Sequence, residues 1–157
     1  MKKYLRFIKE DINIKQIYQP DEISCGPTCI KMTYDFLKGN LAKIDDICSM
    51  CETDDIIGTP PHRMILGLDE LKIKYNEKNG FDELHTAIDK GNPCILRTFT
   101  QKIPHWIVII GYDKDKYIVN DPWLGQLVYN EKQLNDIWKD RDHYFFEILS
   151  EYDQFYT

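Results

Sequence analysis

The chain has 157 residues, and its 20 Lys and Arg against 26 Asp and Glu give a formal charge of −6 at pH 7. This length suits one domain spanning residues 1–157, and 43% apolar with 29% charged residues is typical of a globular protein and excludes a disordered one. The acidic balance argues against a nucleic-acid partner, because phosphate binding draws on clustered Lys and Arg. No apolar run approaches the roughly 20 residues of a membrane helix, so we expect no membrane insertion.

The N-terminus and the cysteines bear on the cellular compartment. Residues 1–10 have a basic start but lack the apolar segment and cleavage site of a secretory signal. The five cysteines are an odd number, so they cannot all form disulfides within one chain. This favours a reducing compartment, and we expect a cytoplasmic protein.

The first half of the chain is predicted to be mainly helical. Residues 12–18 alternate weakly between apolar and polar, which indicates a strand or an extended arm. A helix is predicted over residues 25–37, because Gly26-Pro27 suits a first turn and Gly39 suits the position after a last turn. The other elements predicted in this half are helices over residues 43–51, from Pro60-Pro61 to Leu71 and over 81–90, and a short strand over 73–75.

Beyond Pro93 the apolar residues recur with period two or in continuous runs, which is typical of strands. Strands are predicted over residues 94–99, 106–112, 117–120, 126–129 and 143–149, with a helix over 131–138. Helices followed mostly by strands indicate an α+β fold. We expect an N-terminal helical lobe packed against a C-terminal antiparallel β-sheet lobe, with the site in the cleft between them.

Cys25 is the first candidate for chemistry. It stands where a loop enters a helix, and free backbone N–H groups and the helix dipole there favour a thiolate. Gly26 would let the backbone approach a bound carbonyl, and Gln19 is near enough in sequence to donate a further N–H to a developing oxyanion. Taken alone, a Cys-Gly pair at a helix start is more typical of a small buried hydrophobe.

A base and an orienting carboxylate follow in the second half. His105 comes after Pro104 at the mouth of a very apolar strand, where an imidazole can serve a nucleophilic thiol. The turn at residues 113–116 should fold the next strand back, which brings Asp121 near the level of His105. A carboxylate there can accept the ring N–H and fix the tautomer. Either residue alone is commonly structural, but the order and spacing of all three favour a catalytic set.

With these motifs in place, the chain resembles the papain-like cysteine peptidases, specifically the C39 peptidase group. The best-known members of that group are bacteriocin-processing enzymes that cut leader peptides after a double glycine. The matching features are Gln19, the block Ser24-Cys25-Gly26-Pro27-Thr28-Cys29, His105 before an aliphatic run, and Asp121-Pro122, and the match covers roughly residues 14 to 149. Many relatives read Asp-Cys-Gly where this chain reads Ser-Cys-Gly, and transporter-fused relatives continue into further domains. We expect a stand-alone peptidase domain.

The resemblance implies a papain-like fold and a role for each matched residue. Cys25 would be the nucleophile, His105 the general base and acid, Asp121 the orienter and Gln19 the oxyanion donor. Gly26, Trp106 and Trp123 are candidate substrate-binding residues, although the two Trp fit core packing as well. The expected partner is a peptide or protein substrate, with a leader peptide as one form of it.

Three functions fit these residues: a thiol peptidase, a papain-like acyltransferase, transpeptidase or amidase acting on a small acyl donor, and a silent peptide-binding module. Retention of all four matched residues disfavours the silent module. The spacing Cys48-x-x-Cys51 suits zinc or a redox pair, but four ligands are not evident, so two helix-face cysteines are the favoured interpretation. We expect neither a metal nor a cofactor.

Overall fold

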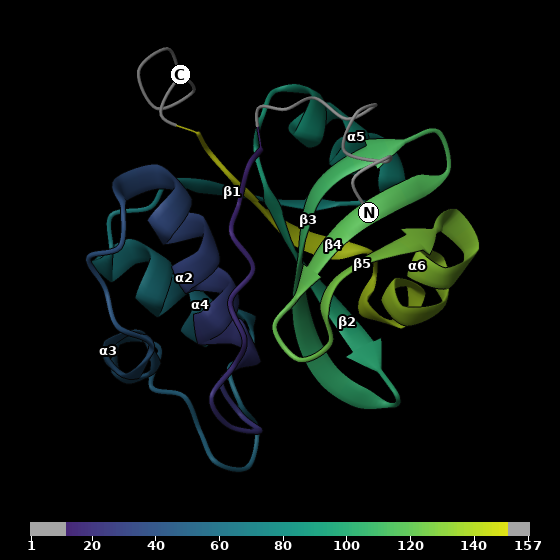
Figure 1. The fold of residues 1–157 in the computed structure, drawn as a ribbon. Helices are drawn as coiled ribbons and strands as arrows, with labels where there is room; N and C mark the ends of the chain where they lie inside the picture. The colour runs from purple at the N-terminus through teal and green to yellow at the C-terminus, as the bar shows by residue number, and fades with distance from the viewer. Residues whose placement is uncertain (1–11, 151–157) are drawn as a thin grey trace.

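Three helices form one side of the molecule in the computed structural model, which describes residues 12–150. They are α2 (Cys25–Lys38), α3 (Ile44–Met50) and α4 (Pro61–Glu70), together called the helical lobe, on the left in Figure 1. α4 begins with Pro61 in its first turn and α2 ends at Gly39, whose φ of 86° is strained for other residues. No helix within residues 12–150 is long and apolar enough to cross a membrane.

The other side of the molecule, the sheet lobe, is built on a six-stranded sheet in the order β1-β6-β2-β3-β4-β5. Every neighbouring pair is antiparallel, as predicted. The strands are β1 (Tyr75–Asn79), β2 (Cys94–Thr100), β3 (Ile103–Asp113), β4 (Lys116–Asp121), β5 (Gly125–Asn130) and β6 (Tyr144–Ile148). The helices of this lobe are α5 (Phe81–Asp89) and α6 (Glu131–Trp138), and the short 3-10 helix η1 (Lys139–Arg141) follows α6. The predicted α+β fold of two lobes is confirmed.

The two faces of the sheet pack against different partners, because successive side chains of a strand point to opposite faces. Phe146 of β6 stacks on Trp106 of β3 at 5.7 Å, and the Trp106 indole N–H donates to the backbone oxygen of Thr59 just before α4. The neighbouring Phe145 instead contacts Trp138 of α6. One face therefore joins the helical lobe and the other is covered by α6.

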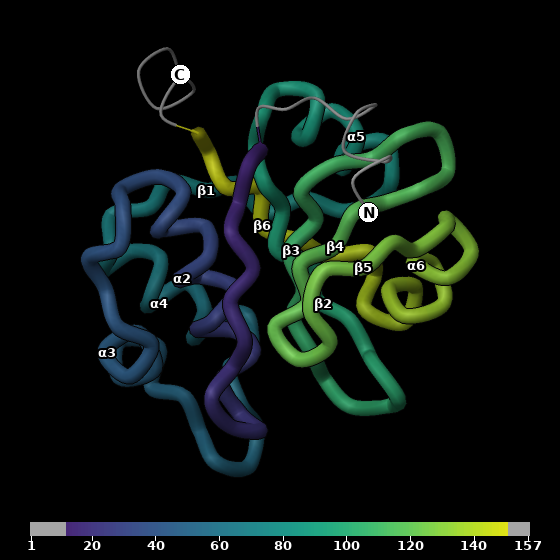
Figure 2. The backbone as a smooth tube through the Cα atoms, viewed as in Figure 1, coloured from purple at the N-terminus to yellow at the C-terminus, as the bar shows by residue number. Residues whose placement is uncertain are grey.

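The segment before α2 is an extended arm that passes between the two lobes, drawn in purple in Figures 1 and 2. Ile12 and Ile14 are buried, and the Ile14 carbonyl accepts from the side chain of Asn120 at 3.0 Å. The side chain of Gln16 donates to the carbonyl of Asp121 at 2.8 Å. Each of these two bonds joins a side-chain amide to a backbone carbonyl. They hold the arm across the end of β4 without the backbone pairing of a strand.

One predicted strand is displaced. The expected strand over residues 73–75 begins only at Tyr75 and runs to Asn79. The amide of Ile73 bonds to the carbonyl of Leu68 at 2.9 Å, so the residues before Tyr75 still close the end of α4. The polar segment that follows becomes an edge strand through its pairing with β6.

The three helices of the helical lobe meet at Gly67 of α4. A Cβ there would overlap the sulfur of Cys51 and lie 3.4 Å from Cδ1 of Ile30 in α2. Cys51 itself is fully buried. Its sulfur therefore fills the space that the missing Gly67 side chain leaves open.

We expect Gly67→Ala to lower the free energy of unfolding by about 1–3 kcal/mol, because overpacking outweighs the gain in helix propensity. In a Cys51→Ala background the overlap is gone, and the same substitution should be neutral or stabilising. Urea denaturation of the four proteins in this double-mutant cycle measures the coupling. An equal loss in both backgrounds would contradict the contact.

Candidate active site

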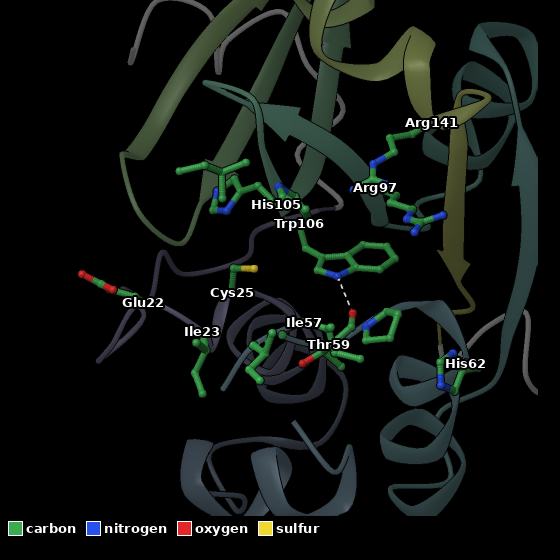
Figure 3. A pocket seen from close by; sticks show the side chains of 15 residues that line it. Glu22, Ile23, Cys25, Ile57, Thr59, His62, Arg97, His105, Trp106 and Arg141 are labelled. Carbon is green, nitrogen blue, oxygen red and sulfur yellow. Dashed lines mark hydrogen bonds between the residues drawn. The ribbon is translucent and has the colours of Figure 1, made fainter. Parts of the chain in front are cut away.

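Cys25 is the first residue of α2, at the end of the arm. Its side chain is 8% exposed and faces the cleft between the lobes (Figure 3). Ser24 precedes the helix but does not cap it, because its hydroxyl donates to Oδ1 of Asp21 at 2.6 Å. The first-turn amides of α2 are thus not taken up by a side-chain cap, and the positive end of the helix dipole lies beside the thiol.

His105 is joined to Asp121 at the start of β3. The His105 Nε2–Asp121 Oδ1 distance is 2.8 Å, and the two side chains are 3% and 0% exposed. Oδ1 of Asp121 also accepts the amides of Trp123 at 2.7 Å and Leu124 at 3.1 Å, which fixes the carboxylate. With Nε2 engaged by Asp121, Nδ1 is the ring nitrogen that remains available to another partner.

The imidazole of His105 is electrostatically biased toward its protonated form. Burial alone lowers its pKa, but the hydrogen bond with Asp121, the interaction with Cys25 and the negative charge of Asp121 outweigh burial. Together they raise the pKa of His105 from 6.5 to about 9. The site therefore favours an imidazolium next to the thiol at neutral pH, the state in which such pairs are reactive.

A β-bulge brings His105 and Asp121 to the same face of the sheet. Gly111 of β3 pairs with Ile118 of β4. Ile109 stands two residues before Gly111 in β3, but its partner Val119 stands only one residue after Ile118 in β4. The extra residue on β3 is Ile110.

The consequence appears at the far end of the hairpin, where Val108 pairs with Asn120. Continuing this register sets Asp121 opposite Ile107, on the same face as His105 and diagonal to it. Without the bulge, Asp121 would stand opposite Val108 and point to the other face. The predicted hairpin is present. The bulge was not predicted, and it is the bulge that places Asp121 on the same face of the sheet as His105.

Gln19 is held by both its backbone and its side chain. Its amide donates to the carbonyl of Pro122 at 2.8 Å, and its Nε2 donates to the carbonyl of Asp21 at 2.7 Å. A side-chain amide nitrogen carries two hydrogens, so one remains for another acceptor. Gln19 is therefore tied to the turn that carries Asp121.

The glycine at position 26 has a packing role. A Cβ there would lie 2.7 Å from Sδ of Met64, 3.1 Å from Cβ of Thr59 and 3.3 Å from Cδ1 of Trp106. This is a different reason for glycine from the predicted approach of a substrate carbonyl. It lets the first turn of α2 pack closely against both β3 and α4.

The two candidate tryptophans are placed differently. Trp106 lines the cleft but is 4% exposed and has its N–H bonded to Thr59. Trp123 is 50% exposed and its ring stands edge-on to His105, with 6.1 Å between the ring centroids. Trp106 is thus a wall that also joins the lobes, whereas Trp123 flanks the outer side of the His105–Asp121 pair.

A cavity of about 600 Å³ extends from Cys25 and His105 along the cleft, a size typical of ligand sites. Its lining comes from the end of the arm, the loop before α4, β2, β3 and η1: Glu22, Ile23, Cys25, Ile56, Ile57, Gly58, Thr59, Pro60, His62, Arg97, Ile103, Pro104, His105, Trp106 and Arg141. Sequence reasoning did not select the arginines or the exposed isoleucines of this lining. The one available signal was Arg97, the charged residue inside a mostly apolar predicted strand.

In the part of the chain that the structure describes, no three His, Cys, Asp or Glu side chains gather closely enough to share a metal ion. Cys51 packs against Gly67, as described above, and burial raises its pKa to about 12. Burial, with Asp21 and Asp45 nearby, raises the pKa of Cys48 to about 11. The packing of Cys51 agrees with the helix-face interpretation of this pair.

The fold is that of C39 peptidase domains. The peptidase domain of Streptococcus ComA, a bi-functional ABC transporter in a quorum-sensing pathway, matches with a TM-score of 0.77 at 16% identity, over 88% of this chain and 100% of that one. A double-glycine motif protease from an AMS/PCAT transporter, solved with its leader peptide, matches with a TM-score of 0.72 at 14% identity, over 87% and 91%. A Bacillus anthracis protein described as a C39-like peptidase matches at 0.71 and 14%, over 88% and 96%.

The family model of the Peptidase_C39 like family matches residues 11–144. The chain therefore belongs to this family. A search of curated proteins finds no match.

Cys25 is expected to be the one thiol of the folded protein that iodoacetamide labels rapidly near neutral pH. Burial raises the pKa of each of the other four thiols, to about 11 for Cys48 and about 12 for Cys51 and well above the usual range for Cys29 and Cys94. Residue-resolved mass spectrometry checks this, with the urea-unfolded protein as the control in which all five react. Equal labelling of Cys25 and Cys48 in the folded protein would contradict it.

The raised pKa of His105 also predicts a pH dependence of stability. Protonated His105 stabilises the fold fully below about pH 6.5, and this contribution is lost as the pH rises through about 9. The NMR titration of the His105 ring should have its midpoint near 9, and Asp121→Asn should lower it because the carboxylate is removed. A midpoint at or below 6.5 in the unaltered protein would contradict this, because it would show that burial lowers the pKa of His105 by at least as much as Asp121 and Cys25 raise it.

Proposed function

We propose that the protein is a cysteine peptidase that hydrolyses a peptide bond through Cys25, His105 and Asp121. The observation that carries this proposal is the buried hydrogen bond between His105 Nε2 and Asp121 Oδ1, with Cys25 lining the same cavity as His105 and helping to raise the pKa of the imidazole. This is the order of contacts that a nucleophile, a base and an orienter require. Membership of the C39-like family supports the same conclusion.

In the proposed reaction, the Cys25 thiolate attacks the carbonyl carbon of the scissile peptide bond. The resulting oxyanion is stabilised by backbone N–H at the start of α2 and by the remaining amide hydrogen of Gln19. Collapse breaks the C–N bond, and imidazolium His105 gives its proton to the departing amine, which leaves a thioester on Cys25. Water then attacks the thioester while His105 accepts one of its protons, and collapse breaks the C–S bond. The carboxylic acid leaves and loses its proton to solvent, and the thiolate–imidazolium pair is restored.

The cleft favours an extended peptide over a small acyl donor. Ile56, Ile57 and Ile103 line the cavity and are 91%, 54% and 48% exposed, so its rim presents apolar side chains to solvent. A rim of this kind suits a chain that enters and leaves the cleft, whereas a small donor is better served by an enclosed pocket. A related protease has been solved with its leader peptide, and we propose a leader peptide as the substrate class here.

Cys25→Ala and His105→Ala are each expected to abolish turnover, and the double variant should be no worse than either single one, because the two residues act as a unit. Asp121→Asn should reduce turnover by orders of magnitude, because the ring loses its orientation. The assay is mass spectrometry of a peptide library after incubation with each protein, and product from heavy-oxygen water should gain one oxygen atom if water is the acceptor. Cys48→Ala is the matched control and should keep full activity.

Turnover that survives in Cys25→Ala would refute the proposed nucleophile. Products that carry a second peptide or amine in place of water oxygen would identify acyl transfer as the reaction. Circular dichroism of each variant separates these outcomes from a failure to fold.

A further inference from the structure

Two arginines from distant parts of the chain lie in the same cleft as Cys25 and His105. Arg97 comes from β2 and Arg141 from η1, and both line the cavity (Figure 3). Both residues are half-buried. Arg97 pairs directly across the sheet with Trp106, the wall of the cleft, so its position is set by the same ladder that positions His105.

Neither guanidinium has a carboxylate partner among residues 12–150. Within the described residues, no carboxylate lies within 4.0 Å of Arg97 or Arg141. Nε of Arg141 is buried and has no hydrogen-bond partner. Arg141 is instead held in place by the ring of Phe99, with its guanidinium carbon 3.6 Å from the ring centroid.

The two positive charges repel each other. Burial and the positive charge of Arg97 lower the pKa of Arg141, because both disfavour a second cation there. The carboxylate in the cavity lining belongs to Glu22, which Figure 3 places on the opposite side of Cys25 from the two arginines. An anion arriving between the arginines would relieve the repulsion and satisfy the free N–H groups.

We propose that Arg97 and Arg141 form a subsite that binds a carboxylate of the peptide substrate. The proposal rests on the proposed peptidase function and names its substrate class: a peptide with a negative charge at one set distance from the scissile bond. Guanidinium groups suit this task because their planar N–H donors match both oxygens of a carboxylate. The carboxylate comes either from an Asp or Glu side chain or from the C-terminus of the peptide.

The first test measures binding without turnover. Cys25→Ala protein is immobilised and offered a peptide library in which each Asp- or Glu-containing sequence has an Asn or Gln counterpart. Each peptide is present with a free and with an amidated C-terminus. Peptides with Asp or Glu should be retained about tenfold more than their Asn or Gln counterparts, as expected for one charge-assisted contact. A preference that follows the free C-terminus alone would identify that source of the carboxylate.

The second test removes the arginines. Arg97→Gln and Arg141→Gln, each in the Cys25→Ala background, should lose the acidic preference while neutral peptides bind as before. Lys90→Gln removes one positive charge from an exposed site on another part of the molecule and should leave the preference intact. Arg97→Gln should also keep or raise the melting temperature, because it relieves repulsion, whereas loss of a purely structural arginine would lower it.

The outcomes separate this proposal from the proposed peptidase function. Cleavage by the unaltered protein with no acidic preference in binding or cleavage would overturn the subsite and leave the peptidase standing. Acid-selective binding that depends on both arginines, without cleavage of any library member, would support the subsite and overturn the peptidase. Acidic preference that persists in both arginine variants would also overturn the subsite.

Discussion

The close approach of the first turn of α2 to β3 is the contact on which the rest of the site depends. Gly26 makes it possible, because a side chain there would meet both Met64 and Trp106. Trp106 then closes the same junction through its bond to the carbonyl of Thr59. The thiol on α2 and the imidazole on β3 come from different lobes. Their relative position is therefore set by how closely α2 packs on β3. Well-packed interiors transmit small displacements, which makes the junction a part of the site.

The imidazole depends on a second constraint, which lies within the sheet. Asp121 is fully buried, and a single oxygen of its carboxylate accepts from His105 and from two backbone amides of the following turn. The arm adds to this from the other side, since Gln16 and Gln19 bond to the carbonyls of Asp121 and Pro122. The Asp121 carboxylate is thus fixed by the turn that follows it and by the segment that leads to Cys25.

The two proposals place chemistry and recognition in different parts of one cleft. His105 and Asp121 are buried, and each offsets the charge of the other when the imidazole is protonated. Arg97 and Arg141, further along the cleft, are half-buried and have no carboxylate partner in the part of the chain that the structure describes. Two like charges held close together lower the free energy of unfolding. Such an arrangement is common where a bound ligand supplies the opposite charge. In these proposals, the apolar rim at Ile56 and Ile57 would contact apolar side chains of the peptide, and the two arginines would bind its carboxylate.

Much of this could be predicted because it depends on short stretches of sequence. Gly26-Pro27 and Gly39 determined the ends of α2, and period-two runs located β2 to β5, because local backbone preferences act within a few residues. The order of Cys25, His105 and Asp121 indicated the site. Only the tertiary structure decided the bulge at Ile110 that turns Asp121 toward His105, and the meeting of Arg97 with Arg141. Strand register and contacts between distant segments are settled by packing over the whole fold, so no local pattern encodes them.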